Sequence, residues 1–167
     1  MPDVNFRPIA ILQTLHAHEV RYVLIGALAA TLHGSPIATN DADICPARDD
    51  ANLQNLAAAL NSLDARLRTT TEPEGVEFVC DASTLKAADI WTLITRYGFL
   101  DISFTPSGTR GFDDLNRDAV DVEITGVTVL CASLLDIIRS KEAANRLKDQ
   151  AVLPLLREML DRYGEHP

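Results

Sequence analysis

Two aspartates that stand two residues apart, Asp41 and Asp43, are the first residues of this chain whose types and spacing could do chemistry. In an extended strand, side chains at this spacing point to the same face, so the two carboxylates converge. Two like charges held this close repel each other unless a cation lies between them. Carboxylate oxygens suit Mg²⁺ or Mn²⁺, which bind one or two carboxylates together with substrate phosphates. The pair therefore predicts a divalent-cation site.

A third carboxylate on a neighbouring strand would complete a site for two cations. Such a site clamps the attacking and leaving oxygens in phosphoryl or nucleotidyl transfer. Asp101 is the first candidate, because it is a charged residue inside an otherwise apolar strand-like segment and needs a partner there. Asp121 and Glu123 also lie two residues apart in a strand-like run and are the competing choice.

Other residues could hold phosphate groups near these carboxylates. Gly26 ends an apolar strand-like run where a short helix is expected to begin. Backbone N–H groups at a helix N-terminus attract phosphate, and a residue without a side chain lets it approach closely. Lys141 and Lys148 lie about two helical turns apart, with Arg146 between them. Asp149 could orient Arg146 or Lys148, or assist the acceptor nucleophile.

Hydrophobic spacing and turn residues predict the elements that must position these groups. We expect helices over Phe6–His18, Ala27–Gly34 and Asp49–Leu63, a short helix or turn over Gly111–Ala119, and two helices over Ser133–Gly164 that break near Asn145. We expect strands over Val20–Gly26, Asp41–Cys45, Val76–Cys80 and Arg96–Pro106, and one on each side of Thr125–Gly126. This order predicts an α+β fold with one small mixed sheet.

The length and composition set broader limits. A chain of 167 residues suggests a single domain, with a core over about residues 20–130 and a helical part over about residues 132–163. No apolar run approaches the roughly 20 residues that span a membrane, and the N-terminal segment has no secretion pattern. Three scattered cysteines indicate reduced thiols, so we expect a cytoplasmic protein without a membrane partner. The net charge of −9 argues against holding nucleic acid by bulk electrostatics alone.

The joint pattern resembles the minimal nucleotidyltransferases, whose catalytic core is like that of DNA polymerase β. The more specific resemblance is to the AbiEii/MenT group of toxin nucleotidyltransferases. The matching residues in the first half are Gly26, Ala29, His33–Gly34, Thr39, Asp41 and Asp43. The matching residues in the C-terminal segment "LLDIIRSKEAANRLKD" are Lys141, Arg146, Lys148 and Asp149.

The resemblance implies a polymerase-β-like fold and transfer of a nucleoside monophosphate from an NTP, with pyrophosphate released. It implies that Asp41, Asp43 and Asp101 hold Mg²⁺ or Mn²⁺. It also implies that Gly26, Ala27 and Thr39, together with Lys141, Arg146, Lys148 and Asp149, serve the nucleotide, with Lys141 also offsetting charge during transfer. In the toxin members the acceptor is the 3′ end of tRNA, where added pyrimidine nucleotides block aminoacylation. A cognate antitoxin protein is the implied partner.

Two positions depart from the family pattern. Ala27 replaces the usual second glycine or serine, and Ile37 replaces the usual arginine before the aspartate pair. Arg146, Lys148 or Arg48 could substitute for that arginine. Two rival functions stay open: a nucleotidyltransferase that modifies an aminoglycoside-like small molecule or a protein hydroxyl, and a non-catalytic module that binds a nucleotide or a partner. The negative charge favours the first rival over tRNA, and Ile37 favours the second.

Overall fold

The computed structural model describes residues 5–165 and is built around one seven-stranded sheet. The strands lie in the order β3-β4-β5-β2-β1-β7-β6. Their bounds are β1 Tyr22–Ile25, β2 Asp41–Pro46, β3 Arg66–Leu67, β4 Ile90–Thr95, β5 Gly98–Ser103, β6 Val120–Ile124 and β7 Val127–Cys131. The β1–β7 and β2–β5 pairs are parallel and the other pairs are antiparallel, so the sheet is mixed.

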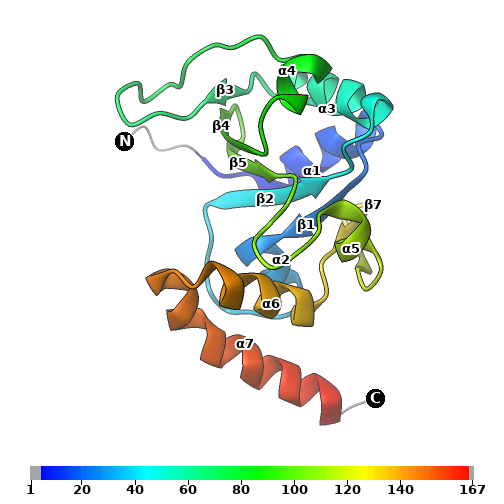
Figure 1. Cartoon of the computed structure of the whole chain (residues 1–167), viewed down its shortest axis with the longest axis vertical. Coiled ribbons are helices and arrows are strands. Elements are labelled where there is room, and N and C mark those ends of the chain that lie inside the picture. The colour runs from blue at the N-terminus through cyan, green and yellow to red at the C-terminus, as the bar shows by residue number, and fades with distance from the viewer. Residues whose placement is uncertain (1–4, 166–167) are drawn as a thin grey trace.

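The helices lie on two sides of this sheet. Their bounds are α1 Pro8–Ala17, α2 Gly26–Leu32, α3 Asp50–Ser62, α4 Ala82–Lys86, α5 Phe112–Asn116, α6 Leu134–Ala144 and α7 Leu147–Glu165. Figure 1 shows α1, α3 and α4 on one side of β1 and β2, and α2, α6 and α7 on the other. Helices α6 and α7 pack against each other and form the lower part of that view.

The two central strands that carry the aspartates alternate between a buried face and a more open one. In β2, Ala42 and Ile44 are fully buried, and in β5, Leu100 and Ile102 are almost fully buried. Successive side chains of a strand point to opposite faces, so the aspartates of these strands lie on the other face. Burial of the apolar residues therefore fixes the register, because a slip by one residue would put carboxylates into the core.

Local capping residues explain where the helices near the site begin and end. The Asp49 side chain accepts a hydrogen bond from the Asn52 N–H and caps α3, and Ser133 does the same for α6 through the Asp136 N–H. Asn145 adopts the left-handed conformation, with φ 51°, and ends α6 before α7 turns back. The predicted helix start at Ser133 and the predicted break near Asn145 are both confirmed.

The predicted α+β class, with a mixed sheet and C-terminal helices, is confirmed. The predicted strand over Val76–Cys80 is wrong: only Val76 forms a bridge, to Leu67, and the rest of the segment is irregular. Val79 is 70% exposed and Phe78 stacks on Trp91, so these strand-forming residue types serve a surface loop instead. The sequence reading also missed β4, which pairs along its whole length with β5.

Cys45 and Cys131 are buried and Cys80 is partly buried, and all three are free thiols. None of the helices within residues 5–165 is both long and apolar enough to cross a membrane.

Candidate active site

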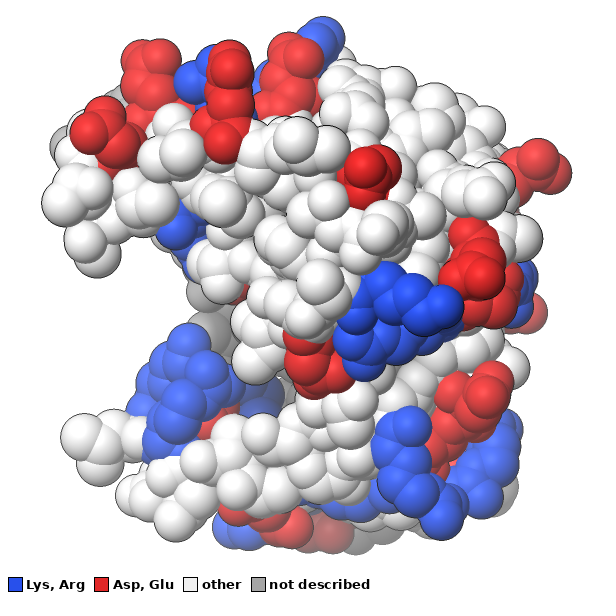
Figure 2. Space-filling model, turned by 45° about the horizontal axis from the view of Figure 1, so that its top comes forward, with Lys and Arg blue, Asp and Glu red and all other residues white. Residues whose placement is uncertain are grey.

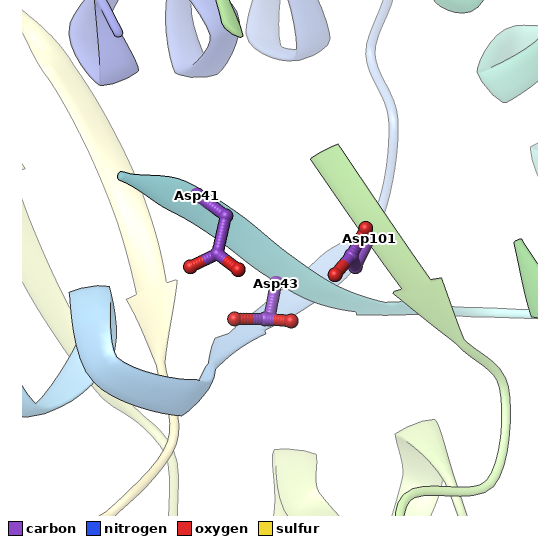
Figure 3. A group of neighbouring side chains, drawn as sticks. All are labelled: Asp41, Asp43 and Asp101. Atoms are coloured by element: carbon purple, nitrogen blue, oxygen red, sulfur yellow. The ribbon is translucent and has the colours of Figure 1, made fainter. Parts of the chain in front are cut away.

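Strands β2 and β5 bring three carboxylates together at the centre of the sheet. The parallel β2–β5 register places Asp43 directly beside Asp101, and Asp41 lies two residues before Asp43 on the same face. One carboxylate oxygen from each of Asp41, Asp43 and Asp101 lies within 4.8 Å of the others. Figure 3 shows the two aspartates of β2 beside the single aspartate of β5. The structure thus places the first candidate for the third carboxylate next to the pair.

The start of α2 lies against this cluster and admits only glycine. Gly26 has φ +70°, a conformation that L side chains rarely adopt. A Cβ atom at Gly26 would lie 2.6 Å from Oδ2 of Asp43, which is too close for any side chain. The β1–β2 register explains this approach, because Ile25 pairs with Asp43 and Gly26 follows directly. Gly26 and Ala27 both line the same cleft as the carboxylates.

The carboxylates repel one another, and Asp43 carries most of the consequence. Burial raises the pKa of Asp43 to about 7, and the neighbouring carboxylates of Asp41 and Asp101 add to this rise. Burial also raises the pKa of Asp101, although the Arg68 guanidinium opposes the shift. The Thr39 hydroxyl donates a hydrogen bond of 2.7 Å to Oδ1 of Asp41. The cluster therefore holds more negative charge than the surrounding protein neutralises.

The chemistry of this donor set fits a divalent cation. Three converging carboxylates supply only hard oxygen ligands, which Mg²⁺ and Mn²⁺ prefer. Repulsion among the three carboxylates falls when a cation lies between them, so binding a cation removes an electrostatic cost of the fold. The residues present thus fit the cation site that the sequence predicts.

Basic residues from α6, α7 and the turn between them line the same cleft as the carboxylates. Lys141 Nζ lies 3.5 Å from Oδ1 of Asp149, and Arg146 Nε donates a 2.7 Å hydrogen bond to Oδ2 of the same carboxylate. Asp149 is 0% exposed. Burial alone would raise the pKa of Asp149, but hydrogen bonds and charge from Arg146, with the charge of Lys141, outweigh burial and lower it. Asp149 therefore holds the side chains of both Arg146 and Lys141 in place. The pairing with Lys141 was not predicted from the sequence.

A large cleft separates the two sets of charges. Its volume is about 890 Å³, and its lining includes all three carboxylates as well as Lys141, Arg146 and Lys148. Figure 2 shows a deep notch with basic side chains on its lower lip, where α6 and α7 join. Lys141 and Lys148 lower the pKa of Asp43 through their charge, which acts against the effect of burial. The cleft could hold a polyanionic ligand between the carboxylates and this lip.

Several residues considered from the sequence lie elsewhere. Asp121 and Glu123 are exposed on β6, the edge strand of the sheet, away from β2 and β5. Arg48 pairs with Asp89 at 3.0 Å and its guanidinium lies over the Phe104 ring, outside the lining of the cleft. Ile37, by contrast, does line the cleft. Arg146 and Lys148 therefore stay the possible substitutes for the arginine expected at that position.

His33 has a structural environment. Its Nε2 lies 2.7 Å from the carbonyl oxygen of Ala132, and its backbone carbonyl accepts a hydrogen bond from the Tyr163 hydroxyl. These contacts connect the end of α2 to the segment before α6 and to the last turns of α7. His33 thus ties together the helices around the cleft.

One residue at the site was missed by the sequence reading. Arg68 Nη2 lies 2.9 Å from Oδ1 and 3.0 Å from Oδ2 of Asp101. The available signal was the alternation of Arg66 and Arg68 around the apolar Leu67, which is typical of a strand with one charged face. The partner of Arg68 could not be read from that pattern, because it lies two strands away in the sheet.

Comparisons with known proteins place the fold. No protein-family model matches the chain, and no curated protein matches it. A candidate nucleotidyltransferase from Thermotoga maritima is 20% identical, with a TM-score of 0.52 over 94% of this chain and 96% of its own. The lincomycin-bound lincosamide antibiotic adenylyltransferase LnuA is 16% identical, with a TM-score of 0.61 over 93% of this chain and 99% of its own. The chain therefore has a fold that these nucleotidyltransferase structures share.

Proposed function

We propose that this protein is a nucleotidyltransferase that uses an NTP, depends on Mg²⁺ or Mn²⁺ and releases pyrophosphate. The observation that carries the proposal is the cluster of Asp41, Asp43 and Asp101 in a cleft whose opposite lip is basic. Triphosphates carry negative charge that needs cations on both sides, and this cleft offers a cation site on one side and lysines on the other. The fold shared with nucleotidyltransferase structures supports the same reaction class.

Asp41, Asp43 and Asp101 would hold the divalent cations. A bound cation neutralises charge on the phosphates and lowers the pKa of the attacking hydroxyl. In the reaction the acceptor oxygen bonds to the α-phosphorus, the bond to the bridging oxygen breaks, pyrophosphate leaves with the bond electrons, and the hydroxyl proton passes to water. Thr39 keeps Asp41 oriented during these steps through its 2.7 Å hydrogen bond.

The triphosphate would lie between the start of α2 and the basic lip. Gly26 and Ala27 line the cleft, and Gly26 has no side chain to keep a phosphate away from the backbone. Lys141, 16% exposed and held by Asp149, provides a fixed positive charge, while Arg146 and Lys148 are more exposed. The fixed lysine would offset charge that develops on the leaving group.

For the acceptor we propose the 3′ end of tRNA, as the resemblance to the toxin nucleotidyltransferases implies. Added pyrimidine nucleotides would then block aminoacylation, and a cognate antitoxin protein would restrain the enzyme in the cytoplasm. The basic side chains at the cleft give a nucleic acid a local site despite the net charge of −9.

A hydroxyl-bearing small molecule is the second candidate acceptor. Two observations favour it: the fold extends over 99% of LnuA, an adenylyltransferase that was solved with lincomycin bound, and the chain is acidic overall. An acidic protein attracts cationic ligands such as aminoglycosides more readily than RNA.

The experiment that tests the proposal is a transfer assay with each α-³²P-labelled NTP, Mg²⁺, and either total tRNA or a panel of aminoglycosides and lincosamides. We expect labelled product with one acceptor class, and a loss on the order of 1,000-fold in Asp41→Asn, because a charged cation ligand is removed. Asp121→Asn is the matched control and should keep wild-type activity. A protein that binds NTP with Mg²⁺ but releases no pyrophosphate with any acceptor would instead be a binding module.

A further inference from the structure

The three carboxylates of the cleft differ in one respect. Within residues 5–165, neither Asp41 nor Asp43 has an ion-pair partner, whereas Asp101 is paired with Arg68. The Nη2 atom of Arg68 contacts both carboxylate oxygens, at 2.9 and 3.0 Å. A donor placed between the two oxygens takes the position from which a cation would bind both of them.

Three contacts hold Arg68 in this position. Its guanidinium lies over the Phe99 ring, 4.4 Å from the centroid. Phe99 stands two residues before Asp101 in β5, so the ring and the carboxylate share one face and grip the guanidinium together. The backbone N–H of Arg68 donates a 2.9 Å hydrogen bond to the carbonyl of Thr92, the residue of β4 that pairs with Asp101.

Partial burial strengthens the ion pair between Arg68 and Asp101. The side chains of Arg68 and Asp101 are only 28% and 24% exposed. A partly buried pair is screened less by solvent than a surface pair, so a cation that approaches Asp101 must displace a bound competitor. A cation shared by Asp41 and Asp43 meets no such competitor. The structure therefore gives the two halves of the cluster different access to cations.

We propose that Arg68 occupies the place of a cation at Asp101, so that cations load in order: first at Asp41 and Asp43, and at Asp101 only when Arg68 has left. This inference rests on the proposed function and adds a positioning residue to it. Arg68 keeps Asp101 neutralised before loading and sets the cation concentration at which the third carboxylate becomes available.

The test is a titration of the purified, nucleotide-free chain with Mn²⁺, with free Mn²⁺ followed by electron paramagnetic resonance. For the wild type we expect one tighter and one weaker class of bound Mn²⁺. In Arg68→Gln the weaker class should tighten by about tenfold or more, because the competing charge is gone. Arg68→Lys should fall between them, because lysine keeps the charge but loses the flat contact with Phe99.

Arg66→Gln is the matched control. Arg66 lies on the same face two residues earlier, but it pairs with the exposed Glu77 at 2.7 Å, and its loss should leave Mn²⁺ binding unchanged. Thermal unfolding in EDTA checks that the variants fold. If Arg68→Gln does not fold, Arg68→Met keeps an apolar stem over Phe99 and should show the same tightening.

The outcomes separate this inference from the proposed function. Wild-type binding that is lost in Asp41→Asn but unchanged in Arg68→Gln and Arg68→Met would overturn the role of Arg68 and leave the cation site standing. Wild-type protein that binds no Mn²⁺, or Asp41→Asn that binds like the wild type, would overturn both.

Discussion

Two charged clusters in this molecule have opposite ratios of carboxylates to arginines. In the cleft, three carboxylates share one paired arginine, Arg68. Between α5 and α6, the carboxylate of Asp114, whose side chain is 3% exposed, contacts three arginines: Arg110 at 3.9 Å, Arg117 at 2.6 Å and Arg139 at 3.1 Å. Arg139 also pairs with Asp136 at 3.0 Å, so three arginines face two carboxylates there.

The two clusters shift their carboxylates in opposite directions. The Arg110 N–H donates a hydrogen bond to Asp114, and with Arg117 and Arg139 it lowers the pKa of that carboxyl despite burial. Burial and like charges raise the pKa of Asp43 to about 7. A cluster that the fold neutralises from within stabilises structure, whereas a cluster left short of positive charge depends on cations from outside. This difference, rather than the number of aspartates, distinguishes a site from a structural network.

The largest effect on stability should come from the neutralised cluster. Asp114→Asn removes the charge that Arg117 and Arg139 share, leaves Arg139 with Asp136 alone, and weakens the bond that holds the Arg110 backbone. We expect the melting temperature to fall by roughly 8 °C, since breaking a buried pair strongly destabilises a fold. Differential scanning calorimetry measures this fall, and the exposed neighbour Asp113→Asn is the control. An equal melting temperature in Asp114→Asn would show that the arginines are not held through this carboxylate.

A smaller effect of opposite sign should come from the cleft. In EDTA, folded Asp43 keeps its proton up to about pH 7, whereas the unfolded chain releases it near pH 3.8. The folded state binds more protons between these values, so stability is highest below this window and falls as the pH rises through it. Asp43→Asn should therefore flatten the decline of the melting temperature between pH 3.8 and about 7, and should raise it by about 4 °C at pH 8.

Saturating Mg²⁺ should raise the melting temperature of the wild type at pH 8 by the same amount as the Asp43→Asn substitution does in EDTA. It should raise the melting temperature of Asp43→Asn by less. A pH profile that is the same in wild type and Asp43→Asn would place the unneutralised charge elsewhere.

The smallest effect is expected at Asp121, which has the same spacing to its acidic neighbour as Asp41 but is exposed on an edge strand. Asp121→Asn should change the free energy of unfolding by less than about 0.5 kcal/mol.

Part of this difference could be predicted from the sequence. The strand–Gly26–helix turn, the Asp41–Asp43 spacing and an ionised residue inside an apolar strand all follow from local patterns. The choice between Asp101 and Asp121 depends on which strand lies beside β2, and that is set by the sheet order rather than by local sequence. The same limit applies to Arg68, whose partner is two strands away.

Tertiary packing explains both errors in the predicted strands: β4, which was not predicted, and Val76–Cys80, which does not form a strand. Ile90–Thr95 and Gly98–Ser103 form a hairpin around Arg96 and Tyr97, a turn without the usual strong turn residues at its centre. Val76–Cys80 has β-branched and aromatic residues but packs Phe78 on Trp91 and leaves Val79 in solvent. Strand propensity reflects how well a residue packs in a half-buried sheet. Here tertiary packing places β4 in the sheet and leaves Val76–Cys80 outside it.

The most direct test of the central claim is a crystal grown with Mn²⁺ and a non-hydrolysable NTP, measured at the manganese absorption edge. We expect anomalous density between Asp41 and Asp43, with the triphosphate between this cation and Lys141. A second peak at Asp101 should appear together with a displaced Arg68. Bound nucleotide with manganese elsewhere, and with all three carboxylates unliganded, would contradict the account.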